Sequence, residues 1–138
     1  MDILIESTKN FEQDLHGLRE IEKAAVISKI NDCASHFSAQ EAENCPDLHR
    51  PSRLLNLNGY ESSLYILRVS QTLRVILAID EDPIFGQNIF TLFRVVNLRE
   101  LDQSYEAIAE SLYQELPHFE RKPPKFIKFI HGANFDSL

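Results

Sequence analysis

The sequence predicts one small α+β domain in which helices and strands are segregated along the chain. Residues 11–37 place apolar side chains at helical spacing, whereas residues 63–96 follow the period of two that is typical of β-strands. A further helical segment follows the strands, and strands and helices do not alternate as they do in parallel α/β folds. We therefore expect one antiparallel sheet with helices packed against it.

Length and composition fit a single cytoplasmic domain. A chain of 138 residues can bury a core without a disulfide or metal, so no cofactor and no metal are expected. The longest apolar runs fall short of the ~20 residues that span a bilayer, and the acidic N-terminus lacks the basic start of a signal peptide. Cys33 and Cys45 are expected to be two free thiols in a reducing cytosol, although a redox pair stays possible.

Charge is distributed unevenly along the chain. The net charge is −7, which is unusual for a nucleic-acid-binding protein. Residues 1–50 hold ten acidic and five basic side chains, but residues 51–100 hold five of each. The five basic ones are all arginines, whose guanidinium groups match phosphate oxygens well: Arg53, Arg68, Arg74, Arg94 and Arg99.

The first third of the chain predicts a strand and two helices. Residues 2–6 are rich in Ile and Leu and form a short strand, and Ser7 or Thr8 caps the helix that follows. Gly17 is a weak point that marks a bend between two helices. Residues 21–37 form a long amphipathic helix, and a loop covers residues 43–52.

From residue 53 the pattern predicts a meander of strands and then a helix. Strands are expected over 53–57, 63–70, 73–80 and 88–96, with turns at 58–59 and 71–72 and a loop over 81–86. Asn97, or Asp102 just after it, caps a helix that runs to about Leu116 and is ended by Pro117. Residues 1–116 are thus the domain, and residues 117–138 are a C-terminal extension, partly ordered at most.

Three segments of the strand region resemble a known family. Residues 64–69 read LYILRV, residues 73–76 read LRVI and residues 93–99 read FRVVNLR, and Tyr105 lies six residues after Arg99. This order of strands, arginines and tyrosine resembles the RelE/ParE superfamily of toxins from bacterial toxin–antitoxin modules, which also serve in plasmid stabilisation. The resemblance spans roughly residues 2–115 and implies a RelE-like fold with a cognate antitoxin protein as partner.

The resemblance also implies roles for individual side chains. Arg74 matches the catalytic arginine of the ribonuclease branch, and Arg99 matches a residue that stabilises charge. Tyr105 matches the tyrosine that orients the substrate nucleotide, while Arg68 and Arg94 add positive charge for substrate binding. Many family members cut mRNA on the ribosome, whereas another branch poisons DNA gyrase and is not a nuclease.

Each of these residues also has a purely structural explanation. Arg74 could be a solvated arginine on an exposed strand face, and Arg99 could pair with Glu100 or Asp102. Tyr105 lies on the apolar stripe of its helix, where a core tyrosine is at least as common. The sequence alone does not choose between these alternatives.

One departure from the family concerns the catalytic base. Ribonuclease members carry lysines in the strand before the Arg-Val strand, where this chain has Tyr65 and Leu67. RNA can be cut without a metal when a base removes the proton of its own 2′-hydroxyl and a cation stabilises the phosphorane. His49, on the loop before the strands, carries an imidazole that could act as this base if it folds over the sheet; the alternative is an exposed loop histidine.

Three functions stay open at this point. The first is a RelE-like toxin that cleaves mRNA on the ribosome, and the second is a non-catalytic protein of the same fold, either a gyrase-directed toxin or a silent antitoxin-binding relative. The third is an unrelated α+β domain, which a structure with parallel strands would establish. No membrane partner is expected. Residues 126–130 could join a sheet edge of this chain or of another, and we expect the tail to cover part of the core.

Overall fold

The computed structural model describes residues 2–38, 45–51, 63–115 and 126–130. The elements along the chain are β1 (Asp2–Thr8), α1 (Lys9–His16), α2 (Glu20–Ser38), β2 (Leu48–His49), β3 (Leu64–Arg68), β4 (Leu73–Asp82), β5 (Gln87–Asn97), α3 (Leu98–Glu115) and β6 (Phe126–Ile130). This order confirms the predicted α+β class, with strand and helices first, then a meander, then a helix.

One six-stranded sheet forms the centre of the molecule, in the order β2-β3-β4-β5-β1-β6. The meander of β3, β4 and β5 is antiparallel, as expected, and β2 also pairs antiparallel with β3. The expectation of a wholly antiparallel sheet is wrong, because β1 pairs parallel with β5. No hairpin joins these two strands, so the local pattern could not fix their relative direction. This parallel pair is the arrangement expected of an unrelated α+β domain, so the sheet does not establish a RelE-like fold, which stays a proposal.

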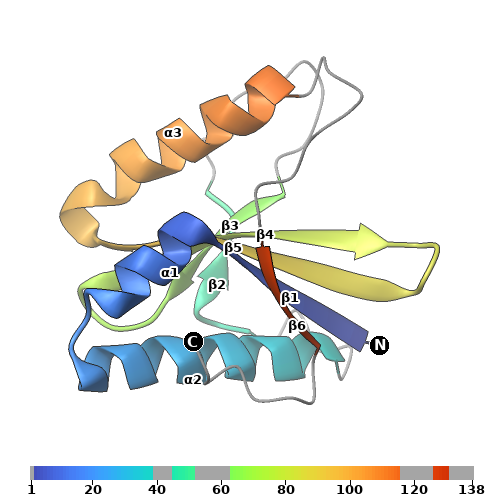
Figure 1. Ribbon diagram of the computed structural model, residues 1–138, viewed down its shortest axis with the longest axis horizontal. Helices are drawn as coiled ribbons and strands as arrows, with labels where there is room; N and C mark the ends of the chain where they lie inside the picture. Colours follow the sequence, from blue (N-terminus) through green and yellow to red (C-terminus); the bar gives the residue numbers. More distant parts are fainter. Residues whose placement is uncertain (1, 39–44, 52–62, 116–125, 131–138) are drawn as a thin grey trace.

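Helices cover both faces of the sheet and give two separate cores (Figure 1). Helices α1 and α2 pack on one face through Phe11, Leu15, Val26 and Ile30. Helix α3 packs on the other face, which the figure shows as the upper one, through Tyr105 and Ala109. Successive residues of β3 and β4 therefore point alternately into the two cores.

The strand boundaries differ slightly from those predicted. The two residues of β2 lie within the segment predicted as a loop, and they form a strand because they pair with the edge of β3. Strands β4 and β5 pair as far as Asp82 and Gln87, so the loop between them is shorter than expected. The predicted strand over 53–57 and the Asn58-Gly59 turn lie outside the described residues.

Local signals set the helix ends. Thr8 has the predicted N-cap role for α1, since its hydroxyl accepts a hydrogen bond from the N–H of Phe11 at 3.2 Å. Asn97 caps α3 in the same way, accepting from the N–H of Glu100 at 3.1 Å. Gly17 ends α1, which confirms a break between two helices. Within the described part of the chain, no helix is long and apolar enough to cross a membrane.

Part of the segment expected as an extension belongs to the sheet. Residues Phe126–Ile130 form β6, which pairs antiparallel with β1, with Ile5 opposite Phe129. The tail therefore joins a sheet edge of its own chain, one of the two arrangements that its alternating pattern allowed. This strand also covers the edge of β1 that faces away from β5.

Candidate functional site

Two of the predicted arginines lie directly opposite each other in the sheet. The register of β3 and β4 pairs Arg68 with Arg74, just as it pairs Ile66 with Ile76. Because Ile66 and Ile76 belong to the core beneath α3, both arginines lie on the same sheet face as α3. Strand alternation alone could not show that Arg68 and Arg74 share a face, and the structure now does.

The third arginine lies at the same end of the sheet. Arg99 is exposed in the first turn of α3, and its neighbour Leu98 donates its N–H to the carbonyl of Thr72 in the β3–β4 turn at 3.0 Å. Helix α3 therefore starts beside the hairpin that carries the other two arginines. We call Arg68, Arg74 and Arg99 the arginine cluster.

No carboxylate neutralises the arginine cluster within the described residues. The guanidinium of Arg74 donates through Nη1 to the carbonyls of Ser70 at 2.5 Å and Leu73 at 2.9 Å, which fixes its direction. Arg68 and Arg99 are both exposed. Among the residues that the structure describes, no ion pair joins Arg99 to Glu100 or Asp102.

A histidine lies on the same face as the cluster. His49 in β2 pairs with Ile66 of β3, so its side chain points to the α3 face and lies diagonally across from Arg68. Such diagonal neighbours in antiparallel strands are roughly 7–8 Å apart. His49 is exposed on this edge strand. The structure thus places the one alternative base that sequence reasoning considered on the same sheet face as Arg68 and Arg74, diagonally across from Arg68 and one strand further from Arg74.

Tyr105 does not join these groups at the surface. Its side chain is 8% exposed and packs in the core between α3 and the sheet, with Leu64, Ile76 and Val96. This position corresponds to the core alternative considered for it. A ring buried there cannot stack on a nucleotide without rearrangement of α3.

Arg94 has a carboxylate partner. Its Nε and Nη2 donate to the two oxygens of Asp14 in α1, at 2.6 and 3.2 Å, and the N–H of Val95 donates to Asp14 at 2.9 Å. The hydrogen bonds to Asp14 raise the pKa of the Arg94 guanidinium above its usual value, against the opposing effect of partial burial. Arg94 consequently fastens α1 to β5.

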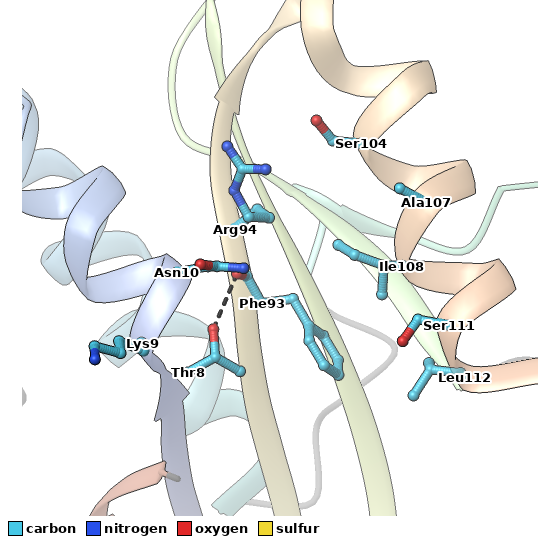
Figure 2. Close-up of a pocket in the computed structure, with 10 residues that line it drawn as sticks. All are labelled: Thr8, Lys9, Asn10, Phe93, Arg94, Ser104, Ala107, Ile108, Ser111 and Leu112. Atoms are coloured by element: carbon cyan, nitrogen blue, oxygen red, sulfur yellow. Dashed lines mark hydrogen bonds between the residues drawn. The ribbon is translucent and has the colours of Figure 1, made fainter. Parts of the chain in front are cut away.

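Arg94 and Phe93 also form the floor of a cavity of about 350 Å³ between α1 and α3 (Figure 2). The register of β4 and β5 shifts here, with Ile76 opposite Arg94 and Leu77 opposite Leu92, so Phe93 is the extra residue of a β-bulge. The bulge turns two consecutive side chains toward the cavity. Other lining residues are Thr8, Lys9, Asn10, Ser104, Ala107, Ile108, Ser111 and Leu112. Neither Arg74 nor Arg99 lines it.

Sequence reasoning missed this cavity because a bulge breaks the period of two. The spacing of α3 does carry a signal, since Ser104, Ser111 and Ile108 recur at intervals of three to four residues, away from the stripe of Tyr105 and Ala109. The sequence did not show that α1 lies opposite this stripe of Ser104, Ile108 and Ser111, because that depends on how α1 packs in the fold.

The described residues thus contain an arginine cluster beside an exposed histidine, and a separate amphipathic cavity whose arginine is already paired. The first arrangement can bind a phosphate through charge-assisted hydrogen bonds. No protein-family model matches the chain, and neither a curated protein nor a solved structure matches it.

Proposed function

We propose that this protein is a RelE-like toxin that cleaves mRNA without a metal, with the arginine cluster binding the scissile phosphate. One observation carries the proposal: Arg68 and Arg74 are directly opposite each other on neighbouring strands, without a carboxylate among the described residues. The resemblance of residues 64–105 to the ribonuclease branch supplies the reaction class.

Charge repulsion explains why this pair points to a ligand. Two like charges directly opposite each other in a sheet are destabilising, and a cross-strand pair contributes up to about 1 kcal/mol in either direction. A phosphate between Arg68 and Arg74 would turn that repulsion into two charge-assisted contacts. Arg74 is already oriented by the carbonyls of Ser70 and Leu73, so its binding loses less side-chain freedom.

The proposed reaction is attack by the RNA on itself. His49 accepts the proton of the 2′-hydroxyl, the 2′-oxygen attacks the adjacent phosphorus, and the bond to the 5′-oxygen breaks. A proton from solvent completes the 5′-hydroxyl, and a 2′,3′-cyclic phosphate is left. Arg68 and Arg74 stabilise the added negative charge of the phosphorane, and Arg99 contributes from the start of α3.

The proposal gives different roles to the other two residues that the resemblance pointed out. Tyr105 supports the site by packing α3 against the sheet, because its ring is buried in the core. Arg94 holds α1 in place through Asp14 and also lines the cavity between α1 and α3. The proposed partners are mRNA on the ribosome and a cognate antitoxin protein.

The test is cleavage of mRNA by purified protein in a translating ribosome system, with the cut ends mapped by primer extension. Removing one group that stabilises transition-state charge costs about 10²- to 10³-fold in rate, and removing a general base about 10²- to 10⁴-fold. We expect Arg74→Ala and His49→Asn to fall in those ranges. Arg19→Ala, an exposed arginine just before α2 on the other sheet face, is the matched control and should cleave normally.

A second candidate function is a non-catalytic toxin of the same fold directed at DNA gyrase. The net charge of −7 and the absence of the family lysines at Tyr65 and Leu67 favour it. Growth arrest with gyrase-linked DNA breaks and intact transcripts would support this candidate and refute the ribonuclease. Equal cleavage by the wild type and Arg74→Ala would refute the role of the arginine cluster.

A further inference from the structure

Two cysteines far apart in the sequence lie side by side in the core. Cys33 belongs to α2, and Cys45 precedes β2, twelve positions later. Their sulfur atoms are 3.3 Å apart, with the thiol of Cys45 donating to the sulfur of Cys33. Both residues are buried, at 1% and 7% exposure respectively. Two reduced thiols are thus held in contact by different elements.

We propose that Cys33 and Cys45 are a modification site at which a small-molecule disulfide, such as oxidised glutathione, produces an intramolecular disulfide bond. This inference rests on the geometry of α2 and the segment before β2, and it is independent of the proposed ribonuclease activity. Both cysteines are free thiols in the structure, as expected, and the inference develops the redox pair that the sequence left possible.

The distance is small enough for the bond to form with local movement only. A disulfide has its sulfur atoms about 2.05 Å apart, so the two atoms must approach by roughly 1.3 Å. The segment of Cys45 is already fastened to its surroundings on the C-terminal side. Lys29 of α2 contacts Asp47 at 2.5 Å, and the carbonyl of Asp47 accepts the N–H of Arg68 at 2.8 Å. These contacts hold Cys45 near α2 before any oxidation.

The order of the two steps follows from exposure. Cys45 is the less buried of the two, at 7% against 1% exposure, so it loses its proton to solvent first, its thiolate attacks oxidised glutathione, and one glutathione thiolate leaves. Cys33 then loses its proton to that thiolate and attacks the sulfur of Cys45. The new bond between Cys33 and Cys45 forms as the mixed disulfide breaks, and the second glutathione leaves. In total two protein thiols are oxidised and one glutathione disulfide is reduced to two thiols.

The low reactivity of Cys33 fits its role in the second of the two chemical steps. Burial raises the pKa of the Cys33 thiol well above its usual value, because the thiolate would lose its hydration. Cys33 is therefore a poor nucleophile toward reagents in solution. Cys33 can act as a nucleophile only toward a sulfur atom that already lies beside it. The Cys45 sulfur of the mixed disulfide is such an atom.

The test is a redox titration of the full chain in glutathione buffers, native and in denaturant. After acid quenching, the remaining free thiols are alkylated, and intact mass and peptide mapping then identify which cysteines are oxidised. We expect the Cys33–Cys45 bond to form in the native protein with an equilibrium constant about 100-fold larger than in the unfolded chain, because closing this loop stabilises the fold by the same factor. The melting temperature of the oxidised protein should exceed that of the reduced protein by roughly 5–10 °C.

Cys33→Ala and Cys45→Ala are the controls, since neither can form the bond and both keep a small apolar side chain in the core. Their melting temperatures should not rise with oxidised glutathione. Equal equilibrium constants in the native and unfolded chains would overturn the proposal. So would a native chain that keeps both thiols alkylatable, or one whose disulfides are only intermolecular.

Discussion

The ion pair of Asp14 with Arg94 makes a sharp prediction about stability. The Asp14 carboxylate accepts two hydrogen bonds from Arg94 and one from the N–H of Val95. Its side chain is 19% exposed and that of Arg94 is 32% exposed, so the pair is neither buried nor at the open surface. Asp14→Ala removes all three contacts and leaves a partly buried guanidinium and a backbone N–H without their partner.

The size of the effect follows from these contacts. Breaking a fully buried ion pair costs 3–5 kcal/mol, and exposed pairs contribute up to about 1 kcal/mol. The unsatisfied N–H of Val95 adds a cost of about 1 kcal/mol. We therefore expect Asp14→Ala to lower the free energy of unfolding by about 2–3 kcal/mol. Asp14→Asn should cost about half as much, since its amide oxygen still accepts from Val95.

The assay is urea unfolding followed by circular dichroism, with Glu22→Ala as the matched control. Glu22 pairs with Arg19 at 3.2 Å, but the arginine side chain is 78% exposed and solvent screens the pair, so its loss should destabilise the fold far less than Asp14→Ala does. The double variant with Arg94→Met should recover part of the loss, because it removes the unpaired charge. The reasoning is refuted if Asp14→Ala destabilises no more than Glu22→Ala does.

Three further predictions follow from single side chains. Tyr105→Ala should destabilise the fold by about 3 kcal/mol in the same unfolding assay, because the ring fills the core beneath α3, whereas a cost below 1 kcal/mol would mean that it is not packed there. Gly86→Ala should cost about 1 kcal/mol because Gly86 has φ +64°, while Gly17→Ala, at φ −79° and with ordinary contacts only, should cost nothing; equal effects would contradict this. Hydrogen bonds from the side chain and backbone N–H of Arg19 lower the pKa of the Glu22 carboxyl below its usual 4.5. The stabilisation from this pair is therefore present above pH 4.5 and is lost as the pH falls through the lowered pKa; NMR titration should find that Arg19→Ala raises this pKa only part of the way, because the backbone bond stays.

The sequence alone determined those helices, strands and helix ends that depend on residues close together in the chain. The alternation of β3 and β4, the caps at Thr8 and Asn97 and the break at Gly17 all depend on neighbours within a few positions, and each was predicted from the sequence. The same alternation predicted that Arg74 shares a face with the apolar residues of its strand.

Only the tertiary structure decided which residues from distant segments meet. The parallel pairing of β1 with β5, the Asp14–Arg94 pair and the contact of Cys33 with Cys45 all join residues that no turn connects directly. Their positions depend on how α1 and α2 pack on the sheet, and many local patterns are compatible with several packings. Sheet register likewise decided that His49 lies beside Arg68, because a shift of one residue would turn it to the other face.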